Sequence, residues 1–170
     1  VTRLFVEFMR HYGVHASALY ILGDFFEVWI GDDDDSPLNR QVRNELRALG
    51  QRGVPVYLMV GNRDFLIGER FAADTGCILL PDPTVIDLHG TPTLLMHGDS
   101  LCTDDVEYQN LRSQVRSPEW RREFLNQPLE ARAGIARDLR EASRRRSKDK
   151  PQTIMDVNQD EVVRVMREYG

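Results

Sequence analysis

Three short apolar runs, each ending beside a glycine flanked by Asp, Asn or His, constrain the fold of this 170-residue chain most strongly. The runs with their polar ends cover residues 19–24, 57–64 and 95–100. An apolar run of this length, bounded by glycine and polar residues, predicts a buried strand of an α/β sheet. Open sheets bind ligands where neighbouring strands end together. We therefore expect the three loops to bring Asp24, Asn62 and His97 to one point.

A carboxylate, an amide oxygen and an imidazole together suit a hard or borderline divalent cation. Each residue also has a structural explanation. Asp24 follows a glycine and is typical of a turn, Asn62 suits a left-handed turn position, and a single histidine at a strand end usually has a structural role. The conjunction of three different ligand types at three strand ends favours a metal site over three unrelated turns.

The bulk composition restricts the possible functions. A chain of this length forms one domain with its own core, and no apolar run approaches the roughly 20 residues of a membrane span. Cys77 and Cys102 are too few for a disulfide framework and predict two reduced thiols. The net charge of −5 argues against a chain-wide nucleic-acid surface, although residues 121–150 hold ten Lys and Arg against five Asp and Glu. The basic run 144–148 is either a solvated helix face or a surface for anionic headgroups and substrate phosphates.

Periodicity predicts the remaining elements. We expect helices over 2–12, 38–49 and 69–75, strands over 19–22 and 54–60, a hairpin formed by 85–88 and 93–97, helices throughout 105–150, and a last helix that begins at a capping box. Asn158 and Glu161 form that box. The acidic run 32–35 predicts a solvated loop or a helix N-terminus, because adjacent carboxylates rarely point at one ion.

Several of these segments carry a family resemblance. Gly23-Asp24, Gly61-Asn62-Arg63-Asp64 and His97-Gly98-Asp99 resemble three of the five signature blocks of calcineurin-like metallophosphoesterases. Within that superfamily, five blocks are closely similar to the UDP-2,3-diacylglucosamine pyrophosphatase (hydrolase) family of Gram-negative lipid A biosynthesis. These blocks are 22–27, 29–33, 61–66, 96–105 and 154–158.

The resemblance implies an α/β calcineurin-like metallophosphoesterase sandwich, with two sheets flanked by helices and a helical lid. Residues 1–104 and 151–170 would form the core, and 105–150 the lid insertion. The implied reaction is metal-dependent hydrolysis of the pyrophosphate bond of UDP-2,3-diacylglucosamine by water attack on the α-phosphorus. Its products would be UMP and 2,3-diacylglucosamine 1-phosphate (lipid X).

The resemblance also implies the site. Two Mn²⁺ ions would be held with the help of Asp24, as the bridging carboxylate, and of Asn62 and His97, and these three residues would be catalytic. Six residues match the positions that contact the substrate in the family: Asn62, Arg63, Asp105, Ser143, Ser147 and Lys150. Ser147 stands where relatives can have Asn. The lipid-linked nucleotide substrate implies peripheral attachment to the cytoplasmic face of the inner membrane. The acidic remainder of the chain and the absence of aromatic residues between the arginines argue against nucleic acid, and no obligate protein partner is predicted.

Two signature blocks of the superfamily are absent from these 170 residues. One is an opening strand that ends in Asp-x-His, and the other is a closing strand that carries Gly-His-x-His. We therefore expect the 170-residue chain to lack the first and last strands of the fold and to be inactive without those metal ligands. Two alternatives stay open. They are another two-metal phosphoesterase, and a non-catalytic fragment that binds lipid or nucleotide through residues 105–150.

Overall fold

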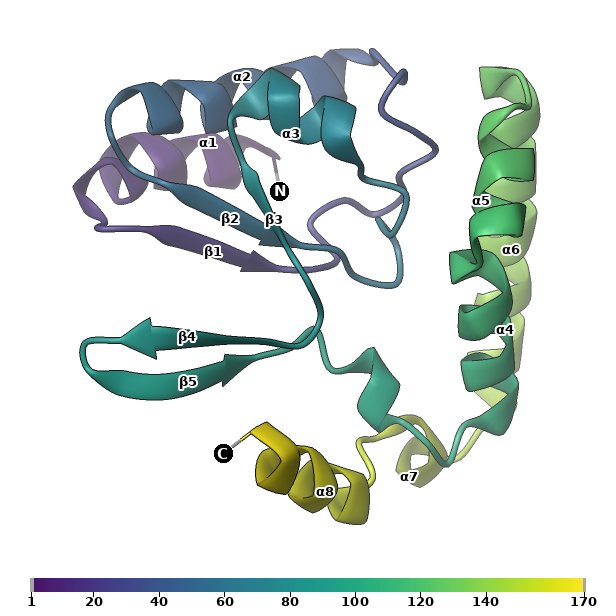
Figure 1. Cartoon of the computed structure of the whole chain (residues 1–170). Helices are drawn as coiled ribbons and strands as arrows, with labels where there is room; N and C mark the ends of the chain where they lie inside the picture. Colours follow the sequence, from purple (N-terminus) through teal and green to yellow (C-terminus); the bar gives the residue numbers. More distant parts are fainter. Residues whose placement is uncertain (1, 170) are drawn as a thin grey trace. The chain divides into compact units, whose positions relative to one another are not determined.

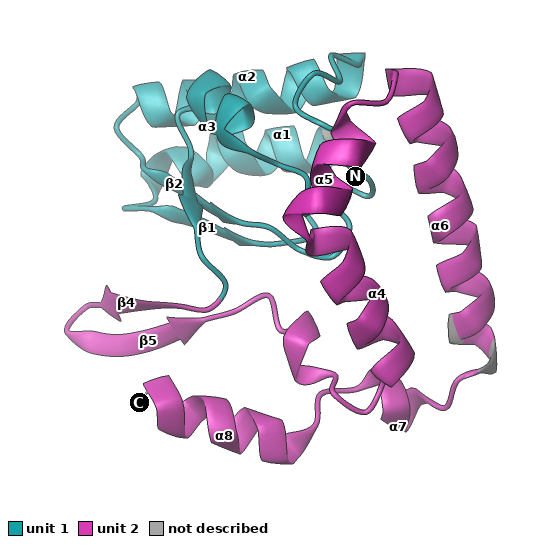
Figure 2. Ribbon diagram, turned by 45° about the vertical axis from the view of Figure 1, so that its right-hand side comes forward, with its two compact units in different colours: residues 1–82 teal, residues 83–170 magenta. Residues whose placement is uncertain are grey.

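A computed structural model describes residues 2–169, apart from the side chains of Thr2, Ser147 and Asp149. The chain divides into two compact units, unit 1 with residues 1–82 and unit 2 with residues 83–170 (Figure 2). Unit 1 holds the residues around Asp24 and Asn62, and unit 2 holds His97 and the helical segment. Each unit is therefore described by itself.

Unit 1 is a three-stranded parallel sheet with helices on one face (Figure 1). Its elements are α1 (Thr2–His11), the 3-10 helix η1 (Gly13–His15), β1 (Leu19–Leu22), α2 (Pro37–Gln51), β2 (Val56–Met59), α3 (Glu69–Thr75) and β3 (Ile78–Leu80). The strand order is β1-β2-β3, with Leu22 opposite Met59 at the carboxyl ends of the first two strands. Helices α2 and α3 make the crossovers that parallel strands require. The loops that follow β1 and β2 therefore begin at the same edge of the sheet.

Local sequence explains the boundaries of α2. Ser36 caps its N-terminus by accepting a hydrogen bond from the Asn39 backbone N–H, and Pro37 occupies the first turn, where a missing N–H costs nothing. Val42, Leu46 and Leu49 recur at helical spacing and are all buried. They form the face of α2 that contributes to the core. Leu38, which the periodicity placed on the same face, is 48% exposed.

An aromatic cluster beside the sheet completes the core of unit 1. The rings of Phe26, Trp29 and Phe71 are buried, with centroids 4.5 Å apart for the first pair and 5.2 Å apart for the second. The guanidinium of Arg43 lies over the Trp29 ring at 5.3 Å. Because Phe26 and Trp29 belong to the loop after β1, this packing holds the loop that begins at Asp24.

Unit 2 consists of a hairpin followed by helices. Its elements are β4 (Thr84–Leu88), β5 (Thr91–Leu95), the 3-10 helix η2 (Asp99–Leu101), α4 (Val106–Arg116), α5 (Pro118–Leu125), α6 (Leu129–Asp149), α7 (Gln152–Met155) and α8 (Gln159–Tyr169). Strands β4 and β5 are antiparallel. The chain runs outward through α4 and α5 and returns through α6 (Figure 2). Asn158 caps α8, since its Oδ1 accepts a hydrogen bond from the Glu161 N–H, but the reciprocal bond of a capping box is not formed, because the Asn158 N–H donates to the Leu101 carbonyl.

The apolar residues of α5 and α6 divide into packed and exposed groups. Trp120 stacks on Phe124 with centroids 4.8 Å apart, and Phe124 is buried. Leu125 and Leu129 are 38% and 37% exposed. Trp120 and Phe124 therefore contribute to the packing of the helical segment. In the described part of the chain, no helix combines the length and apolar character needed to cross a bilayer.

The architecture is α/β with two small sheets, as expected, and is consistent with a metallophosphoesterase-type fold. Two features differ from the sequence predictions. Strand β3 was not expected, because its run of three residues is too short to produce a clear pattern. Strand β5 pairs with β4 in a second sheet, so strand pairing does not put the His97 loop at the edge shared by β1 and β2. The absent terminal strands and the lid role of 105–150 stay predictions.

Candidate functional site

Asp24 and Asn62 follow neighbouring parallel strands, as the sequence predicted. Asp24 lies two residues after the end of β1, and Asn62 lies three residues after the end of β2. Asp24 adopts a left-handed backbone conformation with φ 51°, which is uncommon outside glycine. Asn62 is exposed. A carboxylate and an amide thus occupy two loops that begin at the same sheet edge.

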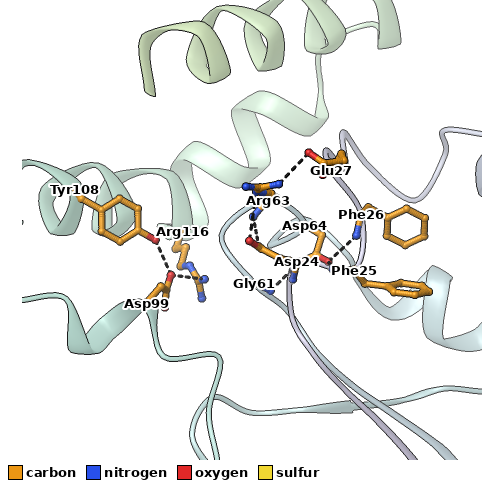
Figure 3. Close-up of polar contacts among 10 residues, drawn as sticks. All are labelled: Asp24, Phe25, Phe26, Glu27, Gly61, Arg63, Asp64, Asp99, Tyr108 and Arg116. Carbon is orange, nitrogen blue, oxygen red and sulfur yellow. Dashed lines mark hydrogen bonds and ion pairs between the residues drawn. The ribbon is translucent and has the colours of Figure 1, made fainter. Parts of the chain in front are cut away.

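Asp64 joins these two loops by accepting four backbone hydrogen bonds (Figure 3). Its Oδ1 accepts from the N–H of Gly61 at 2.6 Å and of Asp24 at 3.3 Å. Its Oδ2 accepts from the N–H of Phe25 at 2.7 Å and of Phe26 at 3.3 Å. Asp64 is 0% exposed. This carboxylate therefore fixes the turn after β1 against the turn after β2 and stabilises the unusual conformation of Asp24.

The pKa of Asp64 lies above its ordinary value. Burial raises the pKa most, because it removes water from the charged form, and the backbone hydrogen bonds from Gly61, Phe26 and Phe25 only partly oppose it. The negative charge of Asp24 raises the pKa further. Neutral N–H dipoles therefore satisfy the carboxylate oxygens without compensating fully for the loss of hydration.

Arg63 bridges two acidic side chains of the loop after β1 (Figure 3). Its backbone N–H donates to Asp24 Oδ1 at 2.9 Å, and its Nε lies 3.4 Å from Asp24 Oδ2. Its Nη1 donates to Glu27 Oε2 at 2.9 Å. The Arg63 side chain is 47% exposed. A guanidinium in this position is held beside the candidate ligand and still presents donors to solvent, which suits a phosphate oxygen.

The acidic run 32–35 does not converge on one point. The carboxylate of Asp32 accepts from the N–H of Gly68 and of Phe71, so it lies at the N-terminus of α3. Asp34 accepts from the Ser36 N–H, just before α2. Asp33 and Asp35 are exposed. The helix N-terminus interpretation is confirmed for Asp34, before α2, and for Asp32, at the start of α3, whereas Asp33 and Asp35 lie exposed in the loop.

In unit 2, His97 lies two residues after β5 and is half-buried. Gly98 follows in a left-handed conformation with φ 95°, where a side chain would be strained. The turn of η2 comes next. The carboxylate of Asp99 is buried there and accepts from Tyr108 and Arg116 (Figure 3) and also from Arg112.

The pKa of Asp99 lies below its ordinary value. Burial acts to raise the pKa, but the hydrogen bonds from Arg112 and Tyr108 and the positive charges of Arg116 and Arg112 outweigh it. In turn, burial and the nearby Asp99 charge raise the pKa of Tyr108. Asp99 is therefore the anionic partner of two arginines from one helix.

Asp105 and Lys150, both expected to contact the substrate, contact each other. Asp105 Oδ1 caps α4 by accepting from the Tyr108 N–H at 3.1 Å, and it lies 2.6 Å from Lys150 Nζ. This ion pair joins the two ends of the helical segment. Ser143 lies exposed on α6. Ser147 also belongs to α6, but its side chain lies outside the part that the structure describes.

Among residues 2–169, no group of three or more His, Cys, Asp or Glu side chains comes close enough to hold a metal ion. Asn62 is not of those types, and Asp24 and His97 belong to different units. The donor chemistry nevertheless fits a divalent cation, since the carboxylate and the amide follow adjacent strands. The assignment of Asp24, Asn62 and His97 to one metal shell stays a prediction.

Two buried residues had no predicted role. Asp64 and Asp99 each lie two positions after a candidate ligand, Asn62 and His97 respectively. Their hydrogen bonds connect segments that are distant in sequence, so periodicity gives no sign of them. The only available signal was their place inside the signature-like blocks.

The fold and these loops define a class: an α/β protein with a carboxylate and an amide at the carboxyl edge of a parallel sheet. No family model matches the chain. The chain is 52% identical over all its 170 residues to the UDP-2,3-diacylglucosamine hydrolase of Cellvibrio japonicus, and 53% identical to that of Marinobacter nauticus. It spans 71% and 70% of those two proteins. A similar relative from Pectobacterium carotovorum is 51% identical over 169 residues. The chain belongs to the UDP-2,3-diacylglucosamine hydrolase family.

Proposed function

We propose that the protein hydrolyses the pyrophosphate bond of UDP-2,3-diacylglucosamine in lipid A biosynthesis. The observation that carries the proposal is identity of about one residue in two along the whole chain to relatives named for this activity. Water attacks the α-phosphorus, the bond from that phosphorus to the bridging oxygen breaks, and the products are UMP and 2,3-diacylglucosamine 1-phosphate. The sheet-edge position of Asp24 and Asn62 supports a reaction centre in this part of unit 1.

The proposed cofactor is a pair of Mn²⁺ ions. Asp24, Asn62 and His97 are the residues of this chain that would hold them, and the carboxylate, amide oxygen and imidazole fit such cations chemically. When bound, two divalent cations clamp a phosphoryl group and make water nucleophilic near neutral pH. The fixed turn around Asp24, which Asp64 holds through backbone hydrogen bonds, would keep the carboxylate oriented toward the ions.

Arg63 is the proposed phosphate-binding residue. Its guanidinium presents several donors in one plane, a geometry that matches phosphate oxygens. The contacts with Asp24 and Glu27 hold it next to the candidate ligands. We expect Asn62 to contact the substrate as well as a metal ion.

Residues 105–150 are the proposed lid, and Asp105, Ser143, Ser147 and Lys150 its substrate-contacting residues. The ion pair between Asp105 and Lys150 supports this by bringing two of them together at the base of the helical segment. The exposed arginines of the run 144–148 support attraction to anionic lipid headgroups. Peripheral attachment to the cytoplasmic face of the inner membrane, without nucleic acid or an obligate protein partner, belongs to the same proposal.

The test is release of UMP from UDP-2,3-diacylglucosamine in the presence of Mn²⁺, with the protein expressed from its complete gene. We expect Asp24→Asn to lower the rate by more than about 100-fold. Loss of a residue that only supports a metal ligand costs about 10-fold to 100-fold, so a larger effect indicates a ligand. The matched control is Asp35→Asn, which removes the same charge from an exposed side chain. Hydrolysis of a simple phosphodiester without release of UMP would instead indicate another phosphoesterase.

We further propose that the 170 residues alone give no turnover, because Asp24, Asn62 and His97 make an incomplete ligand set for two ions. Mn²⁺ binding without hydrolysis by this chain is the expected result. Turnover at the rate of the full-length protein would contradict the two-metal assignment.

A further inference from the structure

We propose that Asp99 is a positioning residue that fixes helix α4 to the loop carrying His97. The inference rests on the proposed function, because its consequence is the placement of His97 and of Asp105 at the N-terminus of α4. All of these residues belong to unit 2, and none of the interactions involved crosses to unit 1.

One oxygen of Asp99 accepts three hydrogen bonds from α4. Oδ2 lies 2.8 Å from the Tyr108 hydroxyl, 2.9 Å from Arg112 Nε and 3.1 Å from Arg116 Nη2. The donors recur every four residues, so they share one face of the helix. The Asp99 side chain is only 5% exposed. A single buried carboxylate therefore fixes the rotation of α4 along more than two turns.

The main chain of the same turn is held from α4 and from the start of α8. Gln109 Nε2 donates to the carbonyl oxygens of Asp99 at 2.8 Å and of Cys102 at 3.0 Å. The Asn158 N–H donates to the Leu101 carbonyl at 2.9 Å. His97 is separated from this turn only by Gly98. A shift of the turn would therefore move the imidazole.

The charges make Asp99 hard to replace. Arg112 and Arg116 each expose about a fifth of their side chain, 21% and 20%, so both guanidinium groups are partly withdrawn from water. Without the carboxylate, both guanidinium groups would lose the buried anion that fixes their position relative to the His97 loop. Displacements of this kind at a metal or substrate site cost about 10-fold to 100-fold in affinity or activity.

The experiment compares Asp99→Asn with Asp104→Asn. The control removes the same charge from an exposed side chain in the same loop, which makes one hydrogen bond with Asn158. Hydrogen exchange of segments 97–102 and 106–116 measures positioning directly. The Mn²⁺ dissociation constant by calorimetry and the KM for UDP-2,3-diacylglucosamine measure its functional consequence.

We expect Asp99→Asn to speed exchange in both segments together, and to raise the Mn²⁺ dissociation constant or the KM about 10-fold. The control should change neither constant more than about twofold. A purely structural role would lower the amount of folded protein but leave both constants of the folded fraction unchanged, and that result would overturn the proposal. Unchanged exchange in either segment would overturn it too.

Arg116→Gln is a second variant that removes one of the three donors, and it keeps the test informative if Asp99→Asn does not fold. We expect a smaller change of the same kind in exchange and in KM, and no change would count against the proposal. If the wild-type protein binds Mn²⁺ but releases no UMP, the proposed function fails, and hydrogen exchange and Mn²⁺ affinity still decide the role of Asp99.

Discussion

Asp64 in unit 1 and Asp99 in unit 2 occupy equivalent places in their loops but satisfy their charge in different ways. Asp64 spreads four backbone N–H donors over both oxygens. Asp99 receives three side-chain donors on Oδ2, while its buried Oδ1 has no hydrogen-bond partner among the described residues. The pKa of Asp64 is raised and that of Asp99 is lowered. Neutral dipoles thus fix a loop geometrically, whereas full charges also stabilise the ionised carboxylate.

The comparison implies that the loss of Asp64 is the more damaging. We expect Asp64→Ala to lower the free energy of unfolding by about 3 kcal/mol or more, because four N–H groups lose their acceptor and each buried one costs about 1–3 kcal/mol. Urea unfolding measures the effect. The control Asp35→Ala changes an exposed carboxylate and should stay within about 0.5 kcal/mol of wild type. Equal costs for the two variants would refute the role assigned to Asp64.

Replacement of Asp99 should cost less stability than replacement of Asp64, and that cost should depend on the salt concentration. We expect Asp99→Asn to lower the free energy of unfolding by about 2 kcal/mol at low ionic strength, since hydrogen bonds to charged groups contribute about 1.5–3 kcal/mol. Because Arg112 and Arg116 are partly exposed, added NaCl should reduce this cost. The cost of Asp64→Asn should not change with salt, as its donors are neutral. The same salt response in both variants would remove the distinction between the two aspartates.

Gly98 gives a test of the backbone between His97 and Asp99. A Cβ at this position would have no atom within 4 Å, so steric contact does not oppose Gly98→Ala. The backbone φ of 95° opposes the replacement, because a residue with a Cβ is strained there, and we expect the free energy of unfolding to fall by about 1 kcal/mol. Gly50→Ala is the control, because Gly50 lies within α2 with equally open space and no positive φ. That replacement should be neutral or stabilising.

Of the interactions compared, the ion pair of Asp105 and Lys150 should contribute least to the free energy of unfolding. Burial acts to raise the pKa of Asp105, but the hydrogen bonds from Lys150 and the Tyr108 N–H hold it below the ordinary value. A lowered acid pKa means stabilisation that is present above the unfolded pKa and is lost as the pH falls through the folded pKa. Lys150→Met should therefore cost about 1 kcal/mol or less at pH 7 and less still near pH 3. A cost that grows on acidification would contradict this sign.

The sequence predicted the elements with clear periodicity and missed the contacts that hold them together. Helical spacing is a local property, and it predicted the buried face of α2 correctly for Val42, Leu46 and Leu49 but not for the exposed Leu38. The hydrogen bond from Phe25 to Asp64 joins residues 39 apart, and no local pattern encodes such a bond.

The candidate ligands Asp24 and Asn62 were found because they end apolar runs, and the structure confirms that those runs are neighbouring strands. The place of His97 could not be predicted in the same way, because β5 ends in a different sheet. The acidic run predicted a helix N-terminus but not which helix each carboxylate would cap. Asp32 caps α3, which begins 37 residues further on, whereas Asp34 lies before α2 and Asp33 and Asp35 are exposed. Local charge density describes composition, whereas each carboxylate's partner is set by tertiary structure.

Hydrolysis in ¹⁸O-labelled water tests the central claim most directly. The protein expressed from its complete gene is incubated with Mn²⁺ and UDP-2,3-diacylglucosamine, and both products are analysed by mass spectrometry. Attack on the α-phosphorus predicts one ¹⁸O atom in UMP and none in 2,3-diacylglucosamine 1-phosphate. Label in the sugar phosphate instead, or release of neither product, would contradict the proposed reaction.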